Sequence, residues 1–268
     1  MSKFNLSNIL PLLIFLGITS TTYAFETLLF QPFTANHLEG RIGTFFQPEN
    51  DKLRLDIGTS LDLLHIYSDS NITARLGGDF FILSRLRSEG HFKFPVETAD
   101  YYFGLNASAT TSCNVSARLR VAHISSHLID GYTDNYEFIQ PLFVYSREFV
   151  DLAIAYNTKY VRPYIGVTAI FSTIPKDVNT FVPQLGFDFN YPIISPISIA
   201  GGYDLKVVGG DNMANVVSNS LQLGVELSLS PTTALSLNYY YYNGYSIHGM
   251  FYNQKESYNG FGIQFVRK

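Results

Sequence analysis

The sequence predicts an all-β fold: a transmembrane antiparallel up-and-down β-barrel of about 12 strands that follows a cleaved signal peptide. Three observations carry this prediction. The chain begins with a short basic region followed by an apolar run, the remainder alternates apolar and polar residues over long segments, and Tyr and Phe cluster at the segment ends.

The N-terminal segment has the features of a secretory signal. Lys3 supplies a positive charge, residues 9–18 are apolar, and Thr22 and Ala24 place small residues where a signal peptidase reads them. An anchoring helix is the alternative, but the apolar run is too short to span a bilayer. We therefore expect residues 1–24 to be the signal peptide, cleaved after Ala24, and residues 25–268 to form one barrel domain.

Strict alternation replaces any helical period in the rest of the chain. In the segment 221–229, Leu221, Leu223 and Val225 alternate with Gln222 and Glu226. Side chains two residues apart on a strand point to the same side, so such a segment has one apolar and one polar face. A soluble sandwich would alternate too, but its strands average about five or six residues, whereas a tilted membrane strand needs about ten.

Turn residues divide the chain into twelve expected strands, an even number as single-chain barrels require. Their ranges are 37–47, 52–66, 71–87, 96–111, 113–129, 138–157, 159–174, 180–191, 195–209, 215–230, 232–250 and 257–267. The last strand carries Phe265 close to the C-terminus. We expect a protein of the bacterial outer membrane that uses the barrel-assembly machinery during biogenesis and has outer-membrane lipid as its partner.

Composition excludes several other classes of function. A net charge of -4 argues against a nucleic-acid partner, which usually requires a basic surface. With Cys113 as its single cysteine, the chain can form no internal disulfide. His123 and His127 share one face of a strand at roughly 13 Å, too far apart to bind one metal ion together. We expect neither a metal site nor a cofactor.

The segment 115–129 carries the residues with possible chemistry. Arg118 and Arg120 share its even face, and an Arg facing lipid at mid-depth costs about 2–4 kcal/mol, so this face should line the lumen. The odd face, with His123, Ser125 and His127, then points outward. We expect the two arginines to find a lumenal partner among four acidic residues: Asp56, Asp62, Asp79 and Glu226.

His123 and Ser125 form the first half of a nucleophile–base pair, because an imidazole lies beside a hydroxyl on one face. A hairpin centred on Gly131 would place Ser125 opposite Glu137, which predicts Glu137 as the third catalytic group. It would also turn Arg147 outward, unless a bulge near Pro141 resets the strand. Two other residues remain open as the third group: Asp130 and Glu148.

Two resemblances accompany these residues. The His-x-Ser pair with Glu137 fourteen residues after His123 resembles outer-membrane phospholipase A and the lipid A deacylase, which implies a serine esterase with a lipid-facing site. The runs ADYYFGL (99–105), ARLRVAHISSHLIDGY (117–132) and VYSREFV (144–150) resemble the bacterial family known as domain of unknown function 1207. Its hallmark resembles H-x-S-S-H-L-G-D-E, and this chain departs from it at Ile129 and Gly131. That family implies no activity.

Two functional hypotheses follow. The first is a lipid esterase with Ser125, His123 and Glu137 as catalytic residues. Four neighbouring residues are candidates for binding: His127, Asp130, Arg118 and Arg120. The second is a barrel without catalysis, such as a narrow pore, a small-solute transporter or a structural protein. An outward-facing His123–Ser125 pair favours the esterase, and a lumenal pair favours a channel constriction.

Overall fold

A computed structural model describes residues 27–133 and 143–267, and these residues contain twelve strands. The strands are β1 (Ile42–Gln47), β2 (Lys52–Ser68), β3 (Ile72–Arg87), β4 (Val96–Thr111), β5 (Val115–Leu128), β6 (Tyr145–Tyr156), β7 (Val161–Ile174), β8 (Phe181–Ile194), β9 (Ile197–Gly210), β10 (Met213–Ser230), β11 (Thr233–Tyr245) and β12 (Lys255–Arg267). Three short helices join them: η3 (Pro48–Asn50), α2 (Asp130–Thr133) and η4 (Gly249–Phe251). None of the helices in these two ranges is long and apolar enough to cross a membrane.

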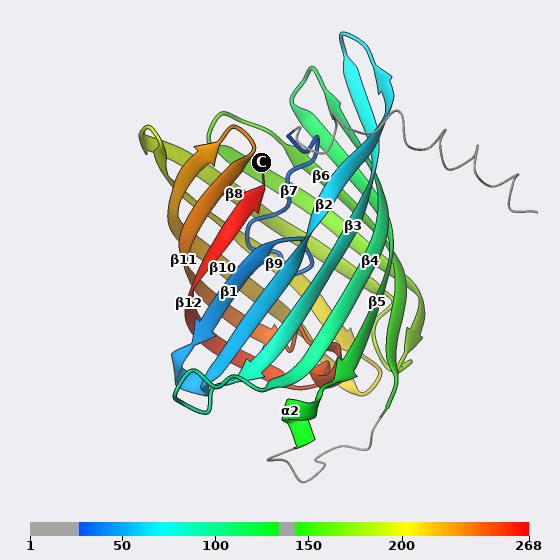
Figure 1. Ribbon diagram of the computed structural model, residues 1–268. Coiled ribbons are helices and arrows are strands. Elements are labelled where there is room, and N and C mark those ends of the chain that lie inside the picture. The colour runs from blue at the N-terminus through cyan, green and yellow to red at the C-terminus, as the bar shows by residue number, and fades with distance from the viewer. Residues whose placement is uncertain (1–26, 134–142, 268) are drawn as a thin grey trace, which may run out of the picture.

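The strands close into one antiparallel barrel in which each strand pairs with its neighbours in sequence and β1 pairs with β12 (Figure 1). The predicted fold class and strand number are therefore confirmed. The connections 69–71, 112–114, 157–160, 195–196 and 231–232 lie at the end that also holds Arg267, which we call the turn end. The opposite end, which carries α2 and the connection 246–254, is the loop end.

The alternation seen in the sequence separates the two faces of the wall. On β10, Leu223 and Val225 are 45% and 51% exposed, whereas Gln222 and Glu226 beside them are 2% and 4% exposed. The outward face is apolar and the inward face is polar, as a barrel immersed in lipid requires. The polar lumen is filled by ion pairs and hydrogen bonds, including the bond between Arg75 and Asp62 at 3.1 Å.

Residues 27–41, which we call the luminal segment, lie inside the barrel and carry no strand (Figure 1). Inward side chains from opposite walls hydrogen-bond to its backbone. Asp62 of β2 accepts a hydrogen bond of 2.8 Å from the Leu29 amide, and Asp188 of β8 accepts one of 2.9 Å from the Thr34 amide. The predicted strand 37–47 is thus wrong in its first half, because residues 37–41 bond to lumenal side chains instead of a neighbouring strand.

The loop end is closed by the connection 246–254, which folds into the barrel mouth. His248 Nδ1 lies 2.6 Å from Asp100 Oδ2, and the Met250 amide donates to Ser126 Oγ at 3.1 Å. Met250 and Phe251 pack in the main apolar cluster of the interior. The predicted strand 232–250 therefore ends at Tyr245, because the residues after it bond to β4 and β5 across the mouth.

Candidate functional site

Five polar side chains lie together on the outer wall and form what we call the outer polar cluster: His123, Ser125, Ser146, Glu148 and Ser172. Strand register brings them together. His123 pairs directly with Glu148 and Ser125 with Ser146 across β5 and β6, and Glu148 pairs with Ser172 across β6 and β7. Residues directly opposite each other on neighbouring strands have side chains within contact distance on one face of a sheet.

The carboxylate of Glu148 is the centre of the cluster. Its Oε1 lies 2.9 Å from His123 Nδ1 and accepts a hydrogen bond of 3.0 Å from Ser146 Oγ. The side chains of His123 and Glu148 are 41% and 32% exposed on the outer surface. A carboxylate bound to Nδ1 fixes the orientation of an imidazole and favours the tautomer whose other nitrogen, Nε2, can accept a proton.

The surface around the cluster is apolar and aromatic. On β4, Phe103 pairs with His123 and Tyr101 pairs with Ser125. Phe103 is 48% exposed, Leu105 72% and Val121 52%. An ionisable pair set in such a surface is costly if lipid covers it, and groups of this kind are often functional.

The structure confirms the predicted facing of β5. Arg118 and Arg120 point into the lumen and are each 2% exposed, whereas His123 and Ser125 are on the opposite, outward face. The predicted lumenal partners are wrong. Both arginines bind Glu39 of the luminal segment, at 2.6 and 3.2 Å, and Arg120 also binds Asp151 at 3.2 Å. The two arginines are therefore parts of the lumenal ion-pair network and lie apart from the outer polar cluster.

The third group predicted from the sequence, Glu137, lies outside the described residues. The register that suggested it is wrong, because Ser125 pairs with Ser146 and not with residue 137. β5 ends at Leu128 and β6 begins at Tyr145, so the two strands are not joined by the tight hairpin centred on Gly131 that the prediction assumed. On β6 the odd residue Asp151 faces the lumen and the even residue Glu148 faces outward, so the alternative carboxylate Glu148 contacts His123.

The two remaining predicted residues lie beyond Ser125 toward the loop end. His127 is exposed two residues beyond Ser125, and its ring meets the ring of Tyr101 edge-on at 5.8 Å between centroids. Asp130 begins α2, where its Oδ1 accepts from the Gly131 amide at 3.0 Å. No sequence motif indicates Ser146 or Ser172, and only the strand register places them beside Glu148.

Comparisons with known proteins identify a family and a fold. The model of the family described as "Protein of unknown function (DUF1207)" matches residues 90–266. No match was found among curated proteins. Outer membrane phospholipase A from Escherichia coli is 12% identical with a TM-score of 0.55, over 87% of this chain and 92% of that chain. The Salmonella typhi outer membrane phospholipase dimer with bound calcium is 13% identical with a TM-score of 0.54, over 88% and 94%. These likenesses show that the chain is a barrel of the outer-membrane type.

Proposed function

Because the chain belongs to the DUF1207 family, whose description names no reaction, we propose its function from the outer polar cluster. The proposed reaction is hydrolysis of an acyl ester of a membrane lipid that reaches the site from the bilayer. Ser125 is the nucleophile, His123 is the general base and Glu148 orients the base. The observation that carries the proposal is the 2.9 Å contact between His123 Nδ1 and Glu148 Oε1, beside a serine on the same outward face.

The reaction follows the chemistry of a serine–histidine–carboxylate triad. Ser125 Oγ attacks the ester carbonyl carbon while His123 Nε2 takes the hydroxyl proton. The imidazolium gives this proton to the leaving alcohol oxygen as the ester bond breaks, which leaves an acyl group on Ser125. Water then attacks the acyl carbonyl and gives a proton to His123. The bond between the acyl carbon and Ser125 Oγ breaks, His123 returns the proton to Oγ, and the fatty acid leaves with the serine hydroxyl restored.

Glu148 has two roles in this scheme. Its bond to Nδ1 holds the ring in place, and its negative charge stabilises the imidazolium that forms in each step. Ser146 in turn donates to the same carboxylate oxygen at 3.0 Å, which fixes the carboxylate. The fold likeness to a protein named as a phospholipase is compatible with this proposal, but at 12% identity it assigns no role to any residue of this chain.

In this proposal the protein resides in the bacterial outer membrane, after removal of residues 1–24 and insertion by the barrel-assembly machinery. Short turns of outer-membrane barrels face the periplasm, so the turn end is the periplasmic end. His123 and Ser125 lie in the half of β5 nearer the loop end. The substrate is therefore an acyl ester of a lipid in the outer leaflet.

The alternative hypothesis of an open pore has less support. The luminal segment bridges opposite walls through buried bonds, and the connection 246–254 covers the loop end. Both features oppose passage of solutes through the described part of the barrel.

The test is the Ser125→Ala variant, assayed by mass spectrometry of fatty acid released from vesicles of phosphatidylethanolamine and lipid A. We expect a fall of at least about a thousandfold, because loss of a nucleophile removes the triad as a unit. Glu148→Gln should lower the rate by a smaller factor, because the base remains but loses its charged partner. The matched control is Ser230→Ala, which removes an exposed serine far along the wall.

Heat-dependent mobility on gels establishes that each variant is folded. Fatty acid release that is identical for the wild type, Ser125→Ala and a preparation from cells with an empty vector would rule out the hydrolase for these lipids.

A further inference from the structure

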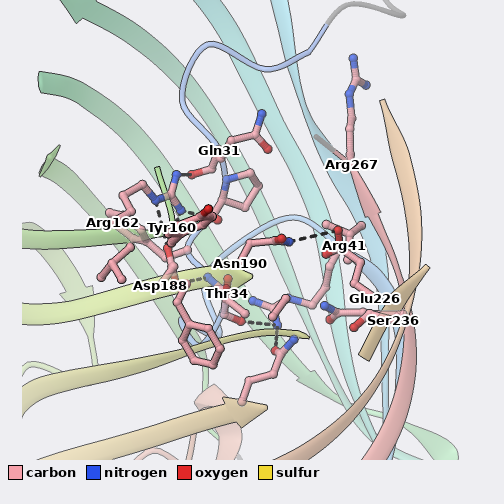
Figure 2. Close-up of a pocket in the computed structure, with 18 of the residues that line it drawn as sticks. Gln31, Thr34, Arg41, Tyr160, Arg162, Asp188, Asn190, Glu226, Ser236 and Arg267 are labelled. Atoms are coloured by element: carbon pink, nitrogen blue, oxygen red, sulfur yellow. Dashed lines mark hydrogen bonds and ion pairs between the residues drawn. The ribbon is translucent and has the colours of Figure 1, made fainter. Parts of the chain in front are cut away.

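A cavity of about 680 Å³ opens at the turn end between the luminal segment and the walls of β7–β12 (Figure 2). The luminal segment also bonds to β2 and β5, on walls that do not line this cavity. The volume lies within the range of about 300–1,000 Å³ that is typical of small-molecule sites. No residue of the outer polar cluster lines this cavity, so its role is independent of the proposed hydrolase.

Arg41 lies at the inner end of the cavity, and its hydrogen-bond partners are uncharged. Arg41 donates to the carbonyl oxygens of Thr34 and Asn36 and, at 3.4 Å, to the side-chain oxygen of Gln222 (Figure 2). In the described ranges, no carboxylate forms a hydrogen bond or ion pair with this guanidinium.

The carboxylates deeper in the lumen are already paired with other cations. Glu39 binds Arg118 at 2.6 Å, and Asp56 binds Arg54 at 3.0 Å. The positive charge of Arg41 at the inner end of the cavity is therefore only partly compensated. A buried charge that lacks an opposite charge favours binding of one.

The walls add to the positive character of the cavity. Arg162 and Asp188 form a pair at 2.5 Å and neutralise each other, while Asn190 donates to Glu226 at 3.3 Å. The basic side chains at the cavity are Arg41, Lys159 and Arg162, against the acidic residues Asp188 and Glu226, whereas the Arg267 side chain extends away from the cavity (Figure 2). The lining thus carries one more positive than negative charge, and an excess of one sign of charge in a cleft concentrates ions of the opposite sign.

The cavity also has an apolar side, formed by Pro32 and Phe33 of the luminal segment. From these features we propose that the cavity binds a small organic anion that enters from the turn end. Its carboxylate or phosphate group reaches Arg41, and its carbon skeleton lies against Pro32 and Phe33. Arg41 and Gln222, which hydrogen-bond to each other, both line the cavity where this acidic group would bind.

The decisive variant is Gln222→Glu, which keeps the shape of the side chain and gives Arg41 a carboxylate partner in place of the ligand. Calorimetric titration of the purified barrel in detergent uses citrate and glucose 6-phosphate as probes, with glucose as the uncharged control. We expect at least one of the two anions to bind the wild type, and which one binds identifies the acidic group. Gln222→Glu should weaken this binding by at least about tenfold, the loss of one charge-assisted hydrogen bond.

Two further variants keep the test independent of folding. Lys159→Glu reverses an exposed charge at the rim and should weaken binding at low salt. Gln254→Glu makes the same chemical change at the loop end and should leave binding unchanged. Binding of neither anion to the wild type, binding of glucose as tight as that of the anions, or equal affinity in the wild type, Gln222→Glu and Lys159→Glu would each overturn the proposal.

Discussion

Replacing Glu39 by glutamine removes the charge that anchors the luminal segment. The Glu39 side chain is fully buried, and it accepts hydrogen bonds from Arg118 at 2.6 and 3.0 Å and from Arg120 at 3.2 Å. Arg120 keeps Asp151 as a partner, but Arg118 loses the carboxylate that it contacts. Removing one partner of a buried ion pair typically costs about 3–5 kcal/mol. We expect the lower end of this range, because glutamine keeps the shape and part of the hydrogen bonding.

The contact between Glu39 and the two arginines should also depend on pH. Burial raises the pKa of Glu39, but Arg118 and Arg120 outweigh this effect and lower the pKa from 4.5 to about 2. A carboxyl whose folded pKa is depressed stabilises the folded state fully above its unfolded pKa, and this contribution is lost as pH falls from about 4.5 toward 2. Protonation of Glu39 in acid should therefore loosen the luminal segment in the same direction as Glu39→Gln.

Chemical labelling measures opening of the luminal segment directly. In a Cys113→Ser background, Ala35→Cys places a thiol where the native side chain is 3% exposed. If opening is a rapid pre-equilibrium, a loss of about 3 kcal/mol should raise the rate of modification by a maleimide about 150-fold in Glu39→Gln. Glu49→Gln, at an exposed position of η3, is the control and should leave the rate unchanged.

The pH dependence is measured by hydrogen exchange, because the reactivity of a thiol itself falls in acid. Amides of residues 28–41 should lose protection, after correction for intrinsic rates, between pH 4.5 and 2 in the wild type but not in Glu39→Gln. Equal labelling rates in Glu39→Gln and Glu49→Gln, together with unchanged protection in acid, would refute the role assigned to this ion pair.

Two further predictions concern the loop end and the wall. Asp100→Asn should weaken the bond to His248 by about 1–3 kcal/mol and make the connection 246–254 more sensitive to limited proteolysis, with unchanged sensitivity as the contrary result. Gly186→Val should prevent formation of the heat-modifiable folded species, because a Cβ at this position would lie 2.4 Å from the Tyr164 ring. The control Gly78→Ala should fold normally, because its Cβ would lie 3.6 Å from the nearest atom. Normal folding of Gly186→Val would contradict the packing described for β7 and β8.

Local periodicity explains which features the sequence predicted correctly. A period of two fixes the facing of every residue on a strand once one residue is assigned, so Arg118 and Arg120 alone placed His123 and Ser125 on the outside. The number of strands followed from the same period and from the turn residues between segments. Both depend only on residues close together in the chain.

Long-range contacts explain what the sequence did not predict. Residues 37–41 look like the start of a strand, but their position is determined by partners far away in the chain, such as Arg118 for Glu39 and Gln222 for Arg41. The register of β5 and β6 does not follow from either strand alone, because Leu128 and Tyr145 lie far apart in the sequence. A tight hairpin was assumed there, and the assumption led to Glu137 in place of Glu148.

The enclosure of the luminal segment sets an order of events in folding. Residues 27–41 are synthesised before any strand, yet Arg41 contacts Gln222, which lies 181 residues later, and Thr34 contacts Asp188, which lies 154 residues later. The sheet becomes a closed cylinder only when β1 meets β12. The segment must therefore be laid against the sheet while the sheet is still open, or it must enter afterward through one mouth. Contacts of such long sequence separation form late and slowly, so we expect cylinder closure and enclosure of the segment to be one late, coupled step.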